Sequence, residues 1–190
     1  MSLLIIGLVL WIGVHLFPSL APNTRKALSG KLGEMPYQGL FSLCILSSVA
    51  LIIIGWRNSA TSPVYDPMPT LGTIAIVLVV VGFILMAAAN SPNTRVKRFI
   101  RHPQLTGVLL WAIAHLLTNG DSRSLLLFSA LTFWSVVSMI TINLRDGPWQ
   151  KPQTYIPLYM DVIIIVIGVV LALVMVWFHE YLSGVSLVGV

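Results

Sequence analysis

Apolar residues run through this chain in six long stretches, separated by short segments that hold most of its charged residues and prolines. An α-helix rises about 1.5 Å per residue, so about 20 apolar residues cross the roughly 30 Å hydrocarbon core of a bilayer. The stretches therefore predict membrane-spanning helices at 3–20, 37–56, 71–90, 103–118, 125–144 and 156–182. The expected fold class is an all-α polytopic membrane helix bundle, with six transmembrane helices in a single domain, 1–190.

Prolines and glycines indicate where the helices begin and end. Pro22-Asn23 follows the first span, and we expect a loop to begin there. The segment 57–70 holds three prolines and predicts a second loop, because proline cannot continue a helix. Pro103 suits a first helical turn, where its missing N–H would have no partner. Asn119-Gly120 is a favourable end for the helix that Pro103 begins.

Small and hydroxyl side chains indicate the faces that pack against another helix. In lipid, small residues let helices approach closely, and hydroxyl groups hydrogen-bond to the same helix or to a neighbour. Gly168 and Ala172 have this spacing in the last span, 87–89 is an alanine run, and Ser42, Ser47 and Ser48 interrupt the second span. These positions predict buried faces or a surface for a partner protein.

Composition agrees with a membrane location. Hydrophobic residues make up 57% of the chain and charged residues only 9%, whereas soluble domains contain about 25% charged residues. The mean hydropathy is +0.92. A net charge of +5 could suggest nucleic acid, but the basic residues form short clusters between apolar stretches, so we expect no nucleic-acid partner. The single cysteine, Cys44, excludes an intramolecular disulfide.

The basic clusters also predict the orientation in the membrane. Loops on the cytoplasmic side of membrane proteins are rich in Lys and Arg. The loops after the first, third and fifth spans contain nine basic residues, and the alternate loops contain only Arg57 and Arg123. We therefore expect both termini on the outer side of the membrane. The basic residues on the cytoplasmic side are Arg25, Lys26, Lys31, Arg95, Lys97, Arg98, Arg101, Arg145 and Lys151.

The first span raises the alternative of a cleaved signal peptide, because 19–21 faintly resembles a cleavage site. No positive charge precedes the span, while Arg25 and Lys26 follow it. Both features favour a retained helix with its N-terminus outside.

A Trp-x-x-x-His pattern occurs twice, as Trp11 with His15 and as Trp111 with His115. Residues four apart share one helix face, so each helix offers an indole beside an imidazole. Ionisable residues inside a membrane are costly and are commonly functional. Two imidazoles in apolar surroundings are typical ligands of a buried haem. Hydrogen bonding to a neighbouring helix and proton transfer are the alternatives, and zinc is disfavoured because neither HxxxH nor CxxC occurs.

The two other histidines have different settings. His102 lies between Arg101 and Pro103 at the expected cytoplasmic boundary, about 20 Å along the helix from His115. It is interpreted as a residue of the helix start that contacts phosphates or a cofactor. His179 precedes Glu180 near the outer end of the last span and is interpreted as an interfacial residue.

The central region resembles the NnrU family of bacterial membrane proteins. The similarity comprises 101–105, Gly107, Trp111, 114–116, 119–121 and 126–128, with His15 and the segments 32–34 and 37–43 as further matches. This resemblance implies a link to denitrification, in which such proteins support nitrite and nitric oxide reduction. It covers most of the chain.

A haem cofactor is also implied by resemblance. The zeta-carotene isomerase is similar to this family and is a haem b enzyme that isomerises a double bond of a lipophilic polyene. Its histidine ligands correspond to His15 and His115 here, and its cysteine before the second ligand corresponds to Ala112. The expected metal ligands are therefore His15 and His115, and the expected cofactor-binding residues add Trp11, Trp111, Arg101 and His102.

Two other functions stay open. Membrane methyltransferases have a similar Arg-His-Pro step, here Arg101 to Pro103, followed by an arginine and paired glutamates. Arg145 and Asp146 are the nearest equivalents, but the chain has no Glu-Glu pair. A non-catalytic assembly or stability factor for a membrane respiratory reductase is the other alternative. The expected partners are thus the lipid bilayer, a reductase and a lipophilic small molecule.

Overall fold

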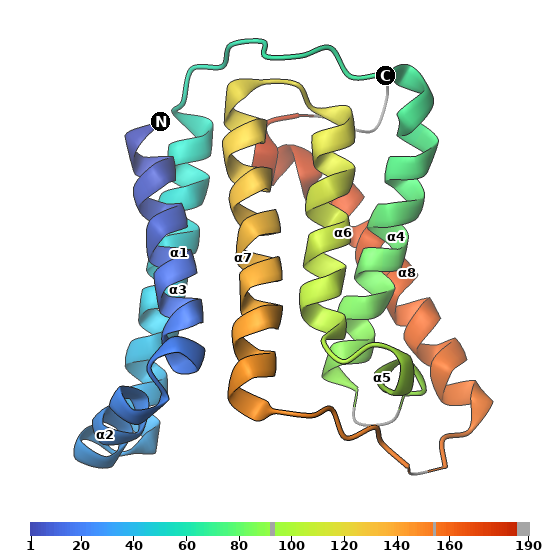
Figure 1. Ribbon diagram of the computed structural model, residues 1–190. Coiled ribbons are helices and arrows are strands. Elements are labelled where there is room, and N and C mark those ends of the chain that lie inside the picture. Colours follow the sequence, from blue (N-terminus) through green and yellow to red (C-terminus); the bar gives the residue numbers. More distant parts are fainter. Residues whose placement is uncertain (92–93, 154, 186–190) are drawn as a thin grey trace.

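The computed structural model describes residues 1–91, 94–153 and 155–185, and the described chain is helical apart from its connections (Figure 1). Within this part, five helices are long and apolar enough to cross a membrane, and a shorter apolar helix covers Pro103–Thr118. The elements are α1 (Ser2–Leu20), α2 (Pro22–Leu32), α3 (Glu34–Arg57), η1 (Pro69–Leu71), α4 (Gly72–Asn90), α5 (Val96–Phe99), α6 (Pro103–Thr118), α7 (Ser122–Asp146) and α8 (Leu158–Ser183).

The predicted spans correspond to α1, α3, α4, α6, α7 and α8. Their boundaries differ by a few residues where local caps decide the ends. α3 begins at Glu34, because Pro36 lies in its first turn and is tolerated there. α7 begins one residue after Asp121, whose carboxylate accepts hydrogen bonds from the backbone N–H groups of Arg123 and Ser124. α8 begins after Pro157, two residues later than predicted.

The prediction of a loop from Pro22-Asn23 was wrong, because these residues open the helix α2. Proline is favourable in the first helical turn, where no N–H is needed. The helix ends at Gly33, which has a positive φ of 87°. Pro22 at the start and Gly33 after the end are therefore sequence signals of a helix, although the segment between them is too polar to be a membrane span. The loop predicted at 57–70 is largely confirmed, since α3 ends at Arg57 and η1 begins at Pro69.

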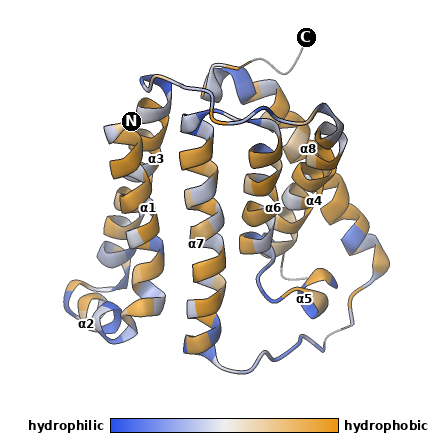
Figure 2. Cartoon of the chain, turned by 45° about the horizontal axis from the view of Figure 1, so that its top comes forward, coloured by the Kyte–Doolittle hydropathy of each residue, from blue (hydrophilic) through white to orange (hydrophobic). Residues whose placement is uncertain are grey.

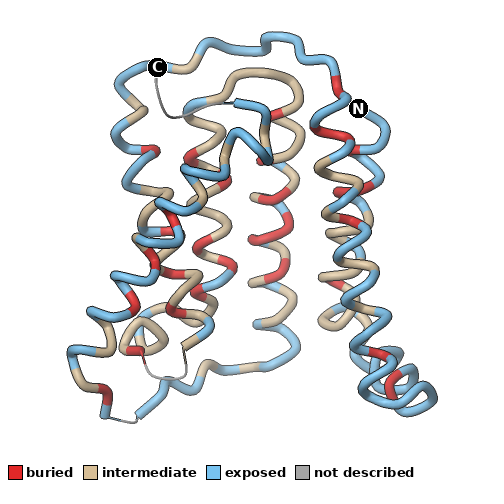
Figure 3. Tube along the Cα trace, turned by 180° about the vertical axis from the view of Figure 1, so that it is seen from behind, coloured by how far each residue is buried: buried red, intermediate tan, exposed pale blue. Residues whose placement is uncertain are grey.

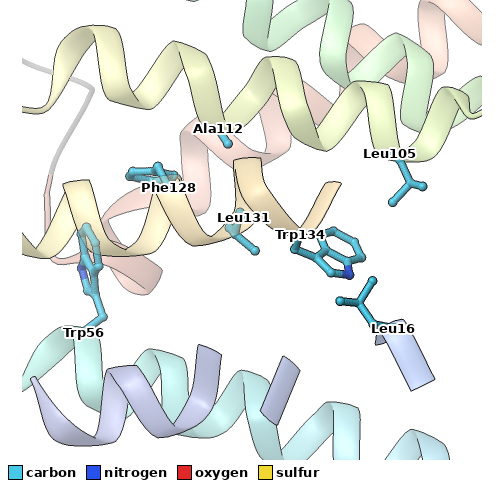
Figure 4. Packing of buried hydrophobic residues seen from close by; sticks show 7 residues of the cluster. All are labelled: Leu16, Trp56, Leu105, Ala112, Phe128, Leu131 and Trp134. Carbon is cyan, nitrogen blue, oxygen red and sulfur yellow. The ribbon is translucent and has the colours of Figure 1, made fainter. Parts of the chain in front are cut away.

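The spanning helices form two groups joined through α7. α1 packs against α3, α4 packs against both α6 and α8, and α7 contacts α1 on one side and α6 on the other (Figure 1). The buried hydrophobic core lies along this line of contact, with Phe128, Leu131 and Trp134 of α7 at its centre (Figure 4). α8 buries only Ile164, Gly168 and Ala172, and most of its other side chains are exposed, as the lipid phase requires (Figure 3).

Glycines permit the closest of these helix contacts. A β-carbon on Gly82 of α4 would lie 2.8 Å from the Gly107 carbonyl oxygen of α6. On α8, a β-carbon at Gly168 would lie 2.5 Å from Ile84 Cα of α4. Gly168 and Ala172 thus pack inside the chain, which agrees with the buried face predicted from their spacing.

The start of α1 and the end of α8 lie at one end of the bundle, together with the α3–α4 loop and the α6–α7 turn (Figure 1). α2, α5 and the connection after α7 lie at the other end, where hydrophilic segments gather (Figure 2). This second end carries the basic clusters of the sequence. The positive-inside rule predicts that this end faces the cytoplasm, so it is called the inner end and the opposite one the outer end.

The α3–α4 loop is fastened to the α6–α7 turn at the outer end. The backbone N–H groups of Val64 and Tyr65 donate to the Gly120 carbonyl oxygen over 2.8 and 3.1 Å, and Ser122 N–H donates to the Ser62 carbonyl over 2.9 Å. The Tyr65 hydroxyl also donates to the Asn119 carbonyl over 2.9 Å. The Asn119-Gly120-Asp121 sequence therefore holds the outer loop as well as ending α6.

Candidate functional site

His15 and His115 have the same local geometry on different helices. The Nδ1 atom of His15 is 2.9 Å from the Trp11 carbonyl oxygen, and Nδ1 of His115 is 2.8 Å from that of Trp111. The ring centroids within each Trp-His pair are 4.1 and 4.6 Å apart. The repeated sequence pattern is thus also a repeated structural unit.

This geometry determines which ring nitrogen carries the proton. A carbonyl oxygen only accepts hydrogen bonds, so Nδ1 of each ring is the donor and carries the hydrogen. In the neutral imidazole, Nε2 then keeps its lone pair. Histidine ligands of metals commonly donate their other ring N–H to a backbone carbonyl in this way. Both Nε2 atoms are therefore available as nitrogen ligands.

Aromatic rings of other helices surround each histidine. His15 lies 5.0 Å from Trp134 of α7 and 6.2 Å from Phe41 of α3, between ring centroids. His115 stacks on Phe128 of α7, with centroids 4.3 Å apart and planes inclined by 29°. Each imidazole is partly buried among apolar groups.

The structure does not bring His15 and His115 together. Their contacts on α7, Trp134 and Phe128, are six residues apart, which corresponds to about 9 Å along a helix axis. His15 lies in the last turns of α1 and His115 in the last turn of α6, and these helices run in opposite directions (Figure 1). In the described chain, no ring contact joins the two imidazoles. Each one is by itself a one-nitrogen site.

His179 of α8, in contrast, lies beside His115. The two ring centroids are 6.5 Å apart, and the ring planes are inclined by 23°. The sequence interpretation of His179 as interfacial did not anticipate this neighbour, because 64 residues separate the two and no local spacing links them. The only sequence signal was that both histidines fall near the outer ends of their spans.

Buried polar atoms without partners gather near His15. The indole N–H groups of Trp11 and Trp134 are buried and have no acceptor among the described residues. Such donors normally find a partner, because leaving one unpaired costs about 1–3 kcal/mol. These two N–H groups are therefore candidate donors to a bound group that accepts hydrogen bonds.

Arg101 and His102 link the start of α6 to the end of α7. Arg101 donates from Nη1 to the Gly147 carbonyl oxygen over 2.8 Å, and His102 donates from Nε2 to Asn143 Oδ1 over 2.8 Å. His102 therefore has its Nε2 protonated, unlike His15 and His115. Both residues lie at the end of α6 opposite to His115, and their predicted cofactor role stays a prediction.

A separate, shallow cavity of about 420 Å³ lies between α1, α2 and α3 and is largely open to the outside. Its lining includes Gly13, Phe17, Leu28, Tyr37 and Phe41. Tyr37 is only 7% exposed, and its hydroxyl has no hydrogen-bond partner within the described chain. Phe41 contacts both this cavity and the His15 ring, so the cavity adjoins the first histidine.

In the segments that the structure describes, no group of three or more His, Cys, Asp or Glu side chains is placed to hold a metal ion. A haem iron needs only one or two protein ligands, since the porphyrin supplies the other four. The isolated histidines are compatible with that requirement.

These features define a multi-pass helical membrane protein with two Trp-His units that contact different parts of α7. The model of the NnrU protein family matches residues 3–187, and the chain belongs to this family. The resemblance found in the sequence is thereby confirmed over nearly the whole chain. No curated protein and no solved structure matches it.

Proposed function

We propose that this NnrU family protein binds haem b in the bacterial inner membrane, with His15 and His115 as candidate axial ligands. The observation that carries the proposal is the hydrogen bond from each Nδ1–H to the carbonyl of a tryptophan four residues earlier. It leaves an unprotonated Nε2 in apolar surroundings, as haem ligation needs. Bound haem would supply a redox-active iron, suited to nitrite and nitric oxide reduction or to isomerase chemistry on a lipophilic substrate.

The residues around His15 and His115 fit such a group. Trp134 and Phe41 provide apolar contact at His15, and Phe128 provides a stacked ring at His115. The unpaired indole N–H groups near His15 offer donors to an anionic substituent. Ala112, three residues before His115, is fully buried in the core. It stands where the isomerase has a cysteine, so this chain has a methyl group in place of the thiol.

The test is the absorption spectrum of the detergent-solubilised protein, oxidised and dithionite-reduced, after expression with added haem. We expect a Soret band and sharp bands in the reduced form. His15→Ala and His115→Ala should each lower the haem content per protein. His102→Ala is the matched control, because its Nε2 is already protonated and bonded to Asn143.

Two results would contradict the proposal. Equal haem content in His15→Ala, His115→Ala and His102→Ala would remove the ligand assignment. A colourless wild-type protein that also fails to take up added haemin would remove haem binding altogether. The Trp-His units would then serve only in packing.

A lipophilic small molecule is a second proposed ligand, favoured by the cavity between α1, α2 and α3. Its lining is almost entirely apolar, which suits a lipophilic guest. A β-carbon at Gly13 would meet no atom within 4 Å, so Gly13→Leu should fill the cavity without disturbing the helices. Native mass spectrometry should show a co-purifying lipophilic molecule that Gly13→Leu loses and Gly72→Ala retains.

The reductase-assembly alternative has less support from the helix faces. Small residues that could admit a partner helix are used within the chain, since Gly168 packs on Ile84 and Gly82 packs on Gly107. A reductase that co-purifies with the chain after mild solubilisation would favour this alternative. No specific contact favours the methyltransferase alternative. Arg101 and His102 of the Arg-His-Pro step already bond to the Gly147 carbonyl and to Asn143 of α7.

A further inference from the structure

The end of α8 brings a second imidazole to His115. The ring of His179 lies 6.5 Å from that of His115, between centroids. Two contacts position this part of α8: the helix packs on α3 and α4, and the Trp56 indole N–H donates to the Ser183 carbonyl over 2.9 Å. His179 therefore approaches His115 as a consequence of helix packing.

His179 presents the same ring nitrogen as His115. Its Nδ1 lies 2.8 Å from the Val185 carbonyl oxygen, so Nδ1 carries the hydrogen and Nε2 keeps the lone pair. The Ser183 hydroxyl donates to the His179 carbonyl over 2.8 Å and lies 3.1 Å from Nδ1. Both imidazoles are thus oriented by backbone carbonyls of their own helix ends, as metal-ligating histidines commonly are.

The distance between the two ring centroids is compatible with two ligands on one metal ion. Metal–nitrogen bonds to histidine are about 2.0–2.1 Å long, which puts the centroids of two opposite imidazoles roughly 6 Å apart. The observed 6.5 Å is close to this value, and the planes are nearly parallel. His15 contacts a different part of α7 and does not share this arrangement.

We propose that His115 and His179 together form a two-imidazole site at the outer ends of α6 and α8, in which both imidazoles would hold one haem iron. The proposal rests on the proposed haem binding, and it replaces His15 as the partner of His115. His15 then supplies a separate one-nitrogen position, beside the middle of α7.

Electron paramagnetic resonance and absorption spectra of the haem-loaded full chain test this pairing. Two imidazole ligands produce low-spin ferric haem, and a single imidazole leaves high-spin iron. We expect a low-spin wild type and loss of the low-spin signal in His179→Ala, with high-spin haem in its place. His15→Ala should bind less haem, but the haem that it retains beside His115 should stay low-spin. Added imidazole should restore the low-spin signal to His179→Ala, which separates a lost ligand from a misfolded protein.

The outcomes distinguish the two proposals. A colourless wild type would end the proposed haem binding and this pairing with it. A haem-loaded wild type whose low-spin signal survives in His179→Ala would overturn the pairing alone. Conversion to high spin in His15→Ala but not in His179→Ala would also overturn it and assign the second ligand to His15.

Discussion

Gly82 and Gly107 face each other where α4 crosses α6, and a β-carbon on Gly107 would lie 2.5 Å from the Gly82 carbonyl oxygen. The two backbones are in contact because neither residue has a side chain. This contact positions α6, the helix that carries Trp111 and His115.

Gly107→Ala should therefore destabilise the protein. Adding a methyl group to a tightly packed helix contact costs about 1–3 kcal/mol, because the helices must separate. Thermal unfolding followed by size-exclusion chromatography should show a lower midpoint. Gly39→Ala is the matched control, since a β-carbon there would meet no atom within 4 Å. Equal midpoints for the two variants would show that α4 and α6 are not in backbone contact.

Gly120→Ala should detach the outer loop. A β-carbon at this position would overlap the Tyr65 carbonyl oxygen, and Gly120 accepts the hydrogen bonds from Val64 and Tyr65. Limited proteolysis should cut segment 58–68 faster in this variant than in the wild type. Tyr65→Phe is the milder comparison. It removes only the hydroxyl, whose single proton is shared between the Leu116 and Asn119 carbonyl oxygens and contributes about 1 kcal/mol. An unchanged cutting rate in Gly120→Ala would contradict the loop attachment.

The carboxylate of Asp121 should make stability depend on acidic pH. Burial alone would raise the pKa of Asp121. The pKa nevertheless lies below its ordinary value, because the carboxylate accepts hydrogen bonds from the Ser124 hydroxyl and from the N–H groups of Ser124 and Arg123, and because the Arg123 charge is nearby. The folded state therefore favours the carboxylate. This contribution is present above the unfolded-state pKa of about 3.9, and it is lost as the pH falls through the lower folded pKa.

Melting temperatures of wild type, Asp121→Asn and Asp121→Ala measure this effect. Asparagine is also a good N-cap, so Asp121→Asn should lose only the charge-dependent part. Its difference from the wild type should stay constant above about pH 5 and shrink as the pH falls through about 3.9 and below. Asp121→Ala should cost about 1 kcal/mol at neutral pH, because the cap of α7 is lost. A difference between wild type and Asp121→Asn that stays constant with pH would exclude the charge effect.

The orientation can be tested with single cysteines in a Cys44→Ala background. Ser62→Cys lies in the exposed outer loop, and Lys31→Cys lies near the exposed end of α2. A membrane-impermeant maleimide should label Ser62→Cys in intact cells and Lys31→Cys only after permeabilisation. Labelling in the opposite order would reverse the orientation that the basic clusters predict.

The membrane spans were predictable because their signal is local. α6 matches its predicted range, 103–118, since Pro103 and Asn119-Gly120 bound it in the sequence itself. α2 was not predicted because it is a polar helix and has no long apolar stretch, although Pro22 and Gly33 mark its ends. The Trp-His units were equally visible, because residues four apart meet on any helix.

The partners of these histidines were not predictable in the same way. Sequence and family resemblance both paired His15 with His115, yet the packed helices place His179 beside His115 and Trp134 beside His15. The Asn119-Gly120-Asp121 sequence, prominent in the chain, proves to fasten a loop that begins 60 residues earlier. Contacts over such separations depend on which helices lie together.

The amino-acid sequence by itself determined the class of protein, the number and extent of its spans and the Trp-His units, because bilayer thickness and helix periodicity act on neighbouring residues. Tertiary structure alone decided which histidines meet and which glycines touch. Helix crossings bring together residues from distant parts of the chain, and the depth at which each side chain lies follows from the direction and packing of its helix.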